Sequence, residues 1–311
     1  MMPSRHTELI TEEERGILRA LLYFDLFQYP LIESEIRAFS TVHLSTDWTA
    51  SLLRLCDRGW IVKQGEYYSL KSNSIRIARR VAGNERARQS MITAKRMSEW
   101  VSRIPFVRAI LLSGSISKGY MDSDSDIDYF IITAPNRLWL VRAALAVIRR
   151  VFLFNSHRYL CTNYFIDDQH LEITEKNIFT AIEIRTLIPM FGGSVVNRFQ
   201  KANQWITDYL PQSVFEASVS GPGSFRVKNL LEHALPDSWF TRLDRWLLAK
   251  SRQYWKRRYK SPLNDQEFSI AFESTPHVSR SHPEFYQKKI IKQYQNAVLQ
   301  LEKQLGISLE P

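Results

Sequence analysis

Cysteine is scarce in this sequence, which contains only Cys56 and Cys161 among its 311 residues. So few cysteines exclude a disulfide framework and indicate a reducing compartment. Neither cysteine stands in the spacing of a metal-binding motif. We therefore expect a fold that depends on an apolar core, which a chain of this length can bury.

Long apolar runs are also missing. The N-terminal stretch MMPSRHTELITEEER contains no apolar segment of the kind found in signal peptides. The longest apolar stretch, 138–154, is interrupted by Arg142, Arg149 and Arg150 and is too short to span a bilayer. We expect a buried helix there, no membrane association and a cytoplasmic location.

Internal repeats and low-complexity segments are absent from the sequence, and its composition is that of a globular protein. Hydrophobic residues make up 44% of the chain, which includes 8 Trp and 13 Tyr. Lys and Arg exceed Asp and Glu by 42 to 32, which gives a net charge of +10. Basic proteins often bind phosphates of nucleic acids, nucleotides or anionic surfaces, although a solvated basic surface has the same composition.

The length predicts two or three domains. We expect a winged-helix-like domain at 1–73, a connecting helix at 74–104, an α/β domain at 105–195 and a helical C-terminal region at 196–311. The winged-helix-like domain is predicted from the order of its helices and strands. A capping box (Thr11 with Glu14) starts the first helix, further helices are predicted near 32–39 and 47–58, and a hairpin near 60–70 turns at Gln64-Gly65.

Three positions along the chain carry basic residues that suit either nucleic acid or solvent. The helix at 47–58 offers Arg54 and Arg58, with Thr49 and Ser51, which is a thin set for reading DNA; packing on a neighbour or partner is the alternative. The connecting helix is rich in Arg and Lys, for which a solvated face is favoured over a polyanion groove. In the helix at 237–260, Trp and Tyr alternate with basic residues. This pattern is typical either of a helix that packs its aromatic side on the core and exposes its basic side to solvent, or of a nucleic-acid surface.

From residue 106 the pattern changes to short apolar runs alternating with helices. Strands are predicted at 107–114, 127–133 and 158–166, with a short edge at 171–173, and helices at 136–152 and 177–190. A final helix is expected at 283–305. The fold class is therefore α+β or α/β, with a small mixed sheet.

One stretch, SGSISKGYMDSDSDID at 113–128, concentrates acidic residues just before a strand. Because side chains on a strand alternate between its faces, Asp126 and Asp128 project to the same side. Two adjacent carboxylates repel each other unless a cation lies between them, and Mg²⁺ binds carboxylates while keeping positions for phosphate and water. We predict a metal clamp at Asp126 and Asp128, with Asp122 and Asp124 as solvated turn residues.

The Gly-Ser turn ahead of these aspartates suits a phosphate. Backbone N–H groups of the turn and the hydroxyl of Ser115 can bind one, and Lys118 adds a positive charge. A metal clamp beside a phosphate cradle is typical of nucleotidyl transfer, in which positioning and charge neutralisation supply most of the catalysis.

This arrangement resembles the DNA polymerase β-type nucleotidyltransferase superfamily, whose signature is an apolar strand, Gly-Ser, a spacer and D-x-D at the start of a second strand. The form GSISKG…SDID is similar to the minimal nucleotidyltransferases of bacteria and archaea. The segments YFDLFQYPL and RLWLVR resemble prokaryotic proteins that carry this domain behind a winged helix. The specific resemblance covers about 105–190. It implies a nucleotidyltransferase domain with two Mg²⁺ ions, a nucleoside triphosphate substrate and release of pyrophosphate.

The resemblance also implies roles for individual residues. Asp126 and Asp128 become catalytic metal ligands, and the nucleotide contacts are Gly114, Ser115, Lys118, Gly119 and Ser125. The family usually adds a third carboxylate from a following strand, where this chain has Asn163. An asparagine can offer its carbonyl oxygen to Mg²⁺ but cannot act as a base. Glu172 is the better catalytic candidate, whereas Glu183 is expected at the edge of the core.

These observations predict a Mg²⁺-dependent nucleotidyltransferase that transfers a nucleoside monophosphate, most simply AMP from ATP, to an unknown acceptor. The acceptor could be a nucleic acid or a protein. The alternative is a winged-helix module that binds nucleic acid or a protein partner and carries a degenerate, nucleotide-binding nucleotidyltransferase domain. An antitoxin-like partner that modifies another protein is a third reading.

Overall fold

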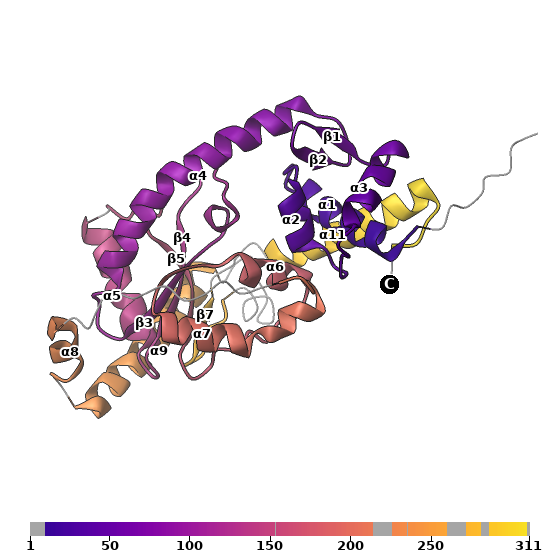
Figure 1. Cartoon of the computed structure of the whole chain (residues 1–311). Coiled ribbons are helices and arrows are strands. Elements are labelled where there is room, and N and C mark those ends of the chain that lie inside the picture. Colours follow the sequence, from indigo (N-terminus) through magenta and orange to yellow (C-terminus); the bar gives the residue numbers. More distant parts are fainter. Residues whose placement is uncertain are drawn as a thin grey trace, which may run out of the picture.

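The structure is a computed structural model that describes residues 10–152, 154–213, 226–234, 236–259, 272–280 and 286–309. It is a mixed α/β protein in which helices surround one five-stranded mixed sheet. Figure 1 shows an N-terminal helical unit set apart from this sheet, with the long helix α4 running from one to the other. In the described part of the chain, no helix combines the length and the apolar character needed to cross a membrane.

The N-terminal unit contains the predicted elements in the predicted order. They are α1 (Glu12–Asp25), α2 (Glu33–Phe39), α3 (Trp48–Asp57), β1 (Val62–Gln64) and β2 (Tyr67–Ser69). The expected capping box is present, since the Glu14 amide donates to Thr11 Oγ1 at 3.2 Å and the Thr11 amide to Glu14 Oε2 at 3.0 Å. Gly65, at φ +63°, makes the turn between the two strands.

The arginines of α3 are engaged within this unit. Arg54 pairs with Glu14 at 2.9 Å and Arg58 pairs with the same carboxylate at 3.3 Å. The Glu14 side chain is fully buried, so this ion pair fastens α3 to α1. Ser51 also bonds to α1, through Glu13 at 2.8 Å. Of the two readings of this helix, internal packing is therefore the one that the contacts favour.

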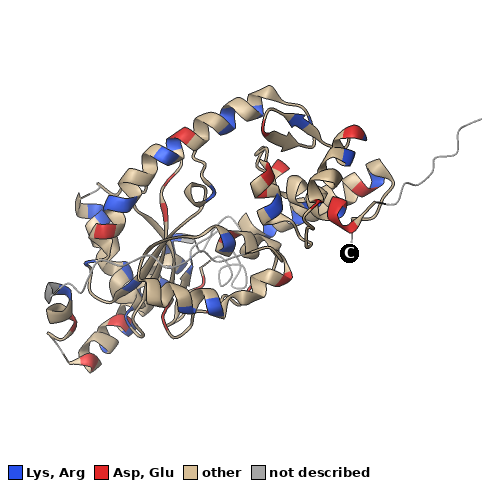
Figure 2. Ribbon diagram, in the orientation of Figure 1, with Lys and Arg blue, Asp and Glu red and all other residues tan. Residues whose placement is uncertain are grey.

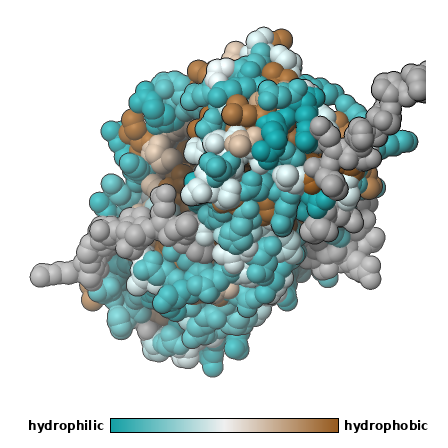
Figure 3. Space-filling model, turned by 45° about the vertical axis from the view of Figure 1, so that its right-hand side comes forward, coloured by the Kyte–Doolittle hydropathy of each residue, from teal (hydrophilic) through white to brown (hydrophobic). Residues whose placement is uncertain are grey.

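Helix α4 (Ser74–Val101) connects the N-terminal unit to the sheet, and Lys and Arg are spread along it in Figure 2. Its first arginines are not simply solvated. Arg76 pairs with Asp25, and the buried Arg80 bonds to Glu35 and lies 4.2 Å from the ring centre of Tyr29. The expected solvated face is thus wrong for the N-terminal half of α4. Its outer side does carry exposed apolar residues, and Figure 3 shows hydrophobic residues scattered among hydrophilic ones in the upper part of the molecule.

The sheet has the strand order β6-β3-β4-β5-β7. The strands are β3 (Val107–Ser113), β4 (Asp128–Thr133), β5 (Cys161–Asp167), β6 (Ile188–Phe191) and β7 (Val278–Arg280). Strands β4 and β5 are parallel and the other neighbours are antiparallel. At one end of the sheet, Asp128 stands opposite Ser113 on β3 and Cys161 on β5, so the three central strands meet at the acidic motif.

Helices cover the sheet and join its parts. They are α5 (Leu138–Phe152), α6 (Ile178–Thr186), α7 (Gly193–Ala202), α8 (Arg226–Glu232), α9 (Asp237–Tyr259) and α11 (Tyr286–Leu305), with short 3-10 turns at Ile116–Lys118 (η1) and Gln204–Asp208 (η2). Helix α5 was expected to be buried, but only one side is, since Trp139 is 1% exposed and Phe152 67%. Helix α9 packs beside α5, and α11 contacts both α1 and α6 (Figure 1).

Three expectations about the second half of the chain were wrong in part. The helix predicted at 177–190 ends at Thr186, and β6 follows it along the edge of the sheet. Pro189 lacks an N–H group, which an edge strand tolerates and a helix interior does not. The C-terminal region is not all helical, because β7 pairs with β5.

The third expectation was a short strand at 171–173, where the structure has none. The side chain of Asn203 takes the place of a strand neighbour. Its Oδ1 accepts from the Ile173 amide at 2.8 Å, and its Nδ2 donates to the Leu171 carbonyl at 2.8 Å. A buried asparagine therefore makes the backbone hydrogen bonds that a neighbouring strand was expected to make.

Candidate functional site

Asp128 is the centre of the candidate site. It begins β4, the middle strand of the sheet, and borders a cavity of about 330 Å³ together with Gly114, Asn163 and Glu183. Asn163 donates from Nδ2 to Asp128 Oδ1 at 3.0 Å. Asn163 reaches this position because the pairing of β4 with β5 shifts register between Tyr129 and Phe130.

The surroundings of Asp128 disfavour the ionised form of its carboxyl. Burial is the main cause that raises its pKa, and the negative charges of Asp126 and Glu183 raise it further. A hydrogen bond with Cys161 and the charge of Lys118 lower the pKa. The net result is a pKa of about 6. A nearby cation would stabilise the ionised carboxylate, because its attraction offsets the repulsion and the desolvation penalty.

Asp128 is the first residue of β4, and Asp126 lies two residues before it, outside the strand. Ile127, between them, is 2% exposed and belongs to the core. Both aspartates are intermediate in exposure, and Asp126 lies close enough to raise the pKa of Asp128 and of the Cys161 thiol. The pair therefore presents two carboxylates on the accessible side of the strand.

Gly114 permits Asp128 to approach the preceding turn. It has φ +68°, and a Cβ at this position would overlap Oδ2 of Asp128 and lie 3.1 Å from its Cγ. The Gly114 carbonyl accepts hydrogen bonds from Ser117 Oγ at 2.8 Å and from Lys118 Nζ at 3.1 Å. Glycine is thus required here for both the backbone conformation and the space beside Asp128.

Glu183 supplies a third carboxylate, which the sequence had placed at the edge of the core. It projects from α6, pairs with Lys118 at 2.9 Å and raises the pKa of Asp128. The signal for it was a lone acidic residue within the apolar segment TAIEI, whose neighbours Ile182 and Ile184 are buried. Periodicity alone could not show that this face of α6 meets the start of β4.

A second cavity, of about 430 Å³, lies on the other side of Gly114 and Glu183. The turn contributes Ser115 and Lys118 to its lining. Six aromatic residues, largely from the N-terminal unit, make up much of the remaining wall, together with Leu26, Gln28, Arg79 and Asp122. The six are Tyr23, Phe24, Phe27, Tyr29, Tyr120 and Tyr286. Tyr29 donates to the Lys118 carbonyl at 3.1 Å, which fastens this wall to the turn. The sequence did not predict that the N-terminal unit would complete the site.

The remaining predicted site residues are placed away from Asp128. Ser125 accepts from the Asp122 amide at 2.9 Å and closes a turn, while Gly119, at φ +68°, ends η1. Glu172 is 54% exposed and pairs with Lys176 at 2.7 Å. Among the described residues these three, like Asp126, line neither the 330 Å³ nor the 430 Å³ cavity, whereas Asp128 lines the first.

The two turn aspartates differ from each other. Asp124 is exposed, as expected for a solvated residue. Asp122 is not simply solvated: it pairs with Arg79 of α4 at 2.7 Å and accepts from the Tyr120 hydroxyl at 2.6 Å. The hydrogen bond from Arg79 is the largest cause that lowers the pKa of Asp122. This aspartate anchors the loop to α4.

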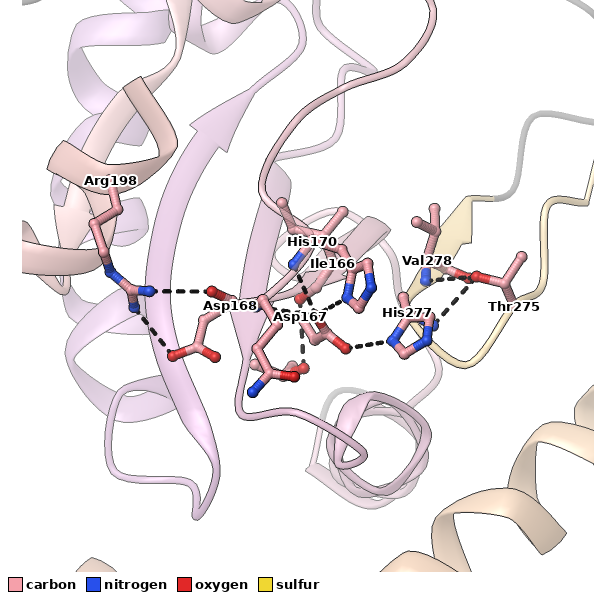
Figure 4. A network of polar contacts seen from close by, with 10 residues as sticks. Ile166, Asp167, Asp168, His170, Arg198, Thr275, His277 and Val278 are labelled. Carbon is pink, nitrogen blue, oxygen red and sulfur yellow. Dashed lines mark hydrogen bonds and ion pairs between the residues drawn. The ribbon is translucent and has the colours of Figure 1, made fainter. Parts of the chain in front are cut away.

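A separate polar cluster occupies the far end of β5 (Figure 4). Asp167, the last residue of β5, bonds to His170 in the next turn and to His277 just before β7, at 2.8 and 2.7 Å. Its neighbour Asp168 pairs with Arg198 of α7 at 3.2 Å. His277 stands 110 residues from Asp167 in the chain, so sequence spacing does not reveal this cluster.

Comparison with known proteins adds no further assignment. No protein-family model, curated protein or solved structure matches this chain. The function must therefore be argued from the cluster around Asp128 and from the cavities that adjoin it.

Proposed function

We propose that the protein is a Mg²⁺-dependent nucleotidyltransferase of the DNA polymerase β type, with a winged-helix unit ahead of the catalytic domain. It would transfer a nucleoside monophosphate, most simply AMP from ATP, to an acceptor. The observation that carries the proposal is the Asp128 carboxyl, which borders a cavity, bonds to Asn163 at 3.0 Å and fits against Gly114, and whose pKa is raised to about 6, mainly by burial. Perturbed titratable groups beside a cavity are typical of functional sites.

The donor set suits a hard divalent cation. Asp126, Asp128 and Glu183 offer carboxylate oxygens, and Asn163 can offer the oxygen of its amide. Bound Mg²⁺ would neutralise phosphate charge and make the α-phosphorus more open to attack. Asp126 and Glu183 act on Asp128 by charge repulsion, although the three carboxylates do not converge within 4.8 Å of one another. A bound cation would compensate this repulsion.

The nucleotide would occupy the aromatic cavity next to the turn. Ser115 and Lys118 line it and can hold the triphosphate, while the rings of Phe27 and the half-exposed Tyr286 are available to a base. In the reaction, an acceptor oxygen bonds to the α-phosphorus and the bond from that phosphorus to the pyrophosphate oxygen breaks. The acceptor proton passes to a carboxylate, for which Glu183 replaces the expected Glu172.

A transfer assay tests the proposal. Purified protein is incubated with each α-labelled nucleoside triphosphate, Mg²⁺ and, in turn, total RNA and total protein as acceptors. We expect the D126N/D128N double variant to lose transfer, because it removes both charges of the clamp. The D124N variant, changed at an exposed aspartate of the same loop, should remain active. If the double variant transfers label as well as the unaltered protein, the proposal fails.

The alternative is a module that binds a nucleotide without transferring it. Asn163 favours it, since an amide stands where the family usually has a carboxylate. Glu183 argues against it, because it restores a third negative charge next to Asp128. Tight Mg²⁺-dependent ATP binding with no transfer to either acceptor pool would favour the alternative. DNA reading by α3 is less well supported, since its two arginines are bound to Glu14.

A further inference from the structure

A large basic groove runs between α5 and α9. Its volume is about 1040 Å³, at the upper end of the range of about 300–1,000 Å³ for small-molecule sites. Five of its lining residues are cationic: Arg142, Arg149 and Arg150 from α5, and Lys250 and Arg258 from α9. None of the described residues that line it is Asp or Glu. The groove therefore concentrates positive charge and favours an anion of several charges.

Arg142 carries part of this positive charge in a buried, desolvated position. Its guanidinium lies among the rings of Trp139, Phe165 and Trp255, at 5.4 to 5.8 Å from their centres, and donates to the neutral hydroxyl of Ser279 at 2.8 Å. Burial, together with the charge of Arg149, lowers its pKa to about 10. A buried cation beside a second cation is stabilised when an anion binds next to it.

Aromatic residues line the same groove. Tyr254 on α9 is 52% exposed and Tyr286, the first residue of α11, is 46% exposed, whereas the Trp255 ring is stacked on Phe272. A positively charged groove with accessible rings is typical of sites for single-stranded nucleic acid, in which phosphates follow the cations and unpaired bases stack on the rings. The bases of a duplex are stacked on each other and do not offer their faces in this way.

The groove ends at the proposed catalytic site. Asn163, which bonds to Asp128, lines both the groove and the 330 Å³ cavity, and Tyr286 lines the groove and both site cavities. His157 lines the groove close enough to Asp126 for that charge to act on its pKa. A strand lying in the groove would thus bring its end close to the carboxylates.

We propose that this groove binds single-stranded nucleic acid and presents its terminal hydroxyl as the acceptor, an inference that rests on the proposed nucleotidyl transfer. The hydroxyl oxygen attacks the α-phosphorus, pyrophosphate leaves, and the strand is lengthened by one nucleotide. The hydroxyl proton passes to a site carboxylate.

Binding is tested without nucleotide or Mg²⁺, by fluorescence anisotropy of a labelled RNA or DNA strand of about 12 nucleotides. The R149Q/R150Q/K250Q variant removes three charges from the groove, and R88Q/K95Q/R96Q removes three from exposed positions of α4. We expect the groove variant to bind at least about 10-fold more weakly with a salt dependence reduced by about two charges, and the control to stay within about 2-fold. Equal weakening in both variants, or equal binding of the duplex, overturns the proposal.

This test separates the groove from the transfer reaction. If strands bind in the groove but no label passes to any acceptor, the proposed function fails and the binding site stands. If label passes only to protein acceptors and strands do not bind, the nucleotidyl transfer stands and the groove proposal fails. Unchanged MgATP binding by the groove variant verifies that its fold and nucleotide site are intact.

A second inference comes from the cluster of Asp167, His170 and His277, shown in Figure 4. One ligand atom from each of these side chains can be chosen so that all three lie within 4.8 Å of one another. The two imidazole rings are stacked, with centres 3.7 Å apart. Three side chains from two distant segments therefore converge on one point.

Asp167 is fully buried, and its partners among the described residues include no Lys or Arg. Within the described residues its oxygens accept from the two imidazoles and from the backbone amides of Gln169 and His170. Its negative charge also raises the pKa of the nearby Asp244. A buried carboxylate that is matched only by imidazoles and amides would gain from a divalent cation.

The two histidines leave access to such an ion. The His170 and His277 side chains are 48% and 38% exposed, so an ion could enter and keep water on its open positions. The cluster is separate from the proposed catalytic site, because Asp128 pairs with the first residue of β5 and Asp167 is the last. Six residues of strand correspond to about 20 Å.

We propose that Asp167, His170 and His277 form a site for a transition-metal ion such as Zn²⁺, which would join the end of β5 to the segment before β7. Imidazole nitrogen with carboxylate oxygen is a ligand set that suits Zn²⁺ and Co²⁺, whereas Mg²⁺ prefers oxygen alone. The site would act as a structural link or, with its open position, bind a further ligand.

Metal content tests this second proposal. Protein freed of metal with EDTA is dialysed against Zn²⁺, and the bound ion is counted; Co²⁺ serves as a spectroscopic probe. We expect one ion per chain in the unaltered protein, in H43A and in D126N/D128N, and loss of this ion in H170A/H277A. The single variant H170Q provides a milder change if the double variant does not fold. Binding that is absent, or unchanged in H170A/H277A and H170Q, contradicts the proposal.

Discussion

Replacing Asp128 with asparagine is expected to make the protein more stable at neutral and alkaline pH. The carboxyl has an ordinary pKa of 3.8 and a pKa of about 6 in the folded protein. The fold therefore favours the protonated form, and ionisation of Asp128 costs stability. A difference of this size corresponds to about 3 kcal/mol, and we expect D128N to recover about 2 kcal/mol of it, because asparagine can still accept the hydrogen bond from Asn163.

The pH dependence gives this prediction its sign. Between about pH 4 and pH 6 the folded protein binds more protons at Asp128 than the unfolded chain does. The contribution of this group to stability therefore falls as the pH rises through that window, and its full cost is present above about pH 6. D128N should lack this component, so the difference between the variant and the unaltered protein should grow from pH 4 to pH 6 and then level off.

Urea denaturation without divalent metal, repeated at several pH values, measures the effect. D124N is the matched control, because it removes one charge from an exposed position in the same loop. Adding Mg²⁺ should stabilise the unaltered protein more than D128N, since an ion that binds the folded form shifts the equilibrium toward it. A variant less stable than the unaltered protein at about pH 8 would show that Asp128 is compensated within the chain.

Acidic residues at the start of a buried strand in a basic protein fit a site that binds a cation. Gly114 leaves no room for a side chain between the turn and Asp128, and Glu183 brings a second charge from α6. Both features lower the stability of the folded protein when Asp128 is ionised and no cation is bound. A site that is costly in this way and borders cavities is more readily explained by ligand binding than by folding.

Local features were predictable because short segments of sequence determine them. The capping box at Thr11, the strands on each side of the Gly-Ser turn, and the shared side of Asp126 and Asp128 all follow from spacing within a few residues. Three helices followed by a hairpin were predicted for the same reason. In these places local preference and tertiary structure agree.

Features that join distant segments were missed. Glu183 reaches Asp128 only because α6 packs across the end of the sheet, and Tyr29 reaches the Gly-Ser turn through the packing of the N-terminal unit. The edge strand β6 lies in a segment whose apolar residues fit a helix equally well, and its pairing with β3 decides the outcome. The triad at Asp167 needs His277, which stands 110 residues away in the chain.

Replacing Gly192 with alanine is expected to be the most damaging single-methyl change in the described part of the chain. Gly192 lies between β6 and α7 at φ +86°, and its backbone passes directly over β3. A Cβ there would overlap the Arg108 carbonyl oxygen and lie 2.7 Å from Ala109 Cα. Because these are backbone atoms of a central strand, no side chain can move aside to relieve the overlap.

The comparison with Gly59 separates the two causes of damage. Gly59 has a similar positive φ of +68°, but a Cβ there would meet nothing within 4 Å. G59A should therefore cost only the backbone strain, about 1–2 kcal/mol. G192A should cost about 4 kcal/mol or more, since it adds a clash that displaces β3, the strand that leads into Gly114. Urea denaturation of both variants measures the difference, and equal losses would show that β3 yields to the extra methyl group without cost.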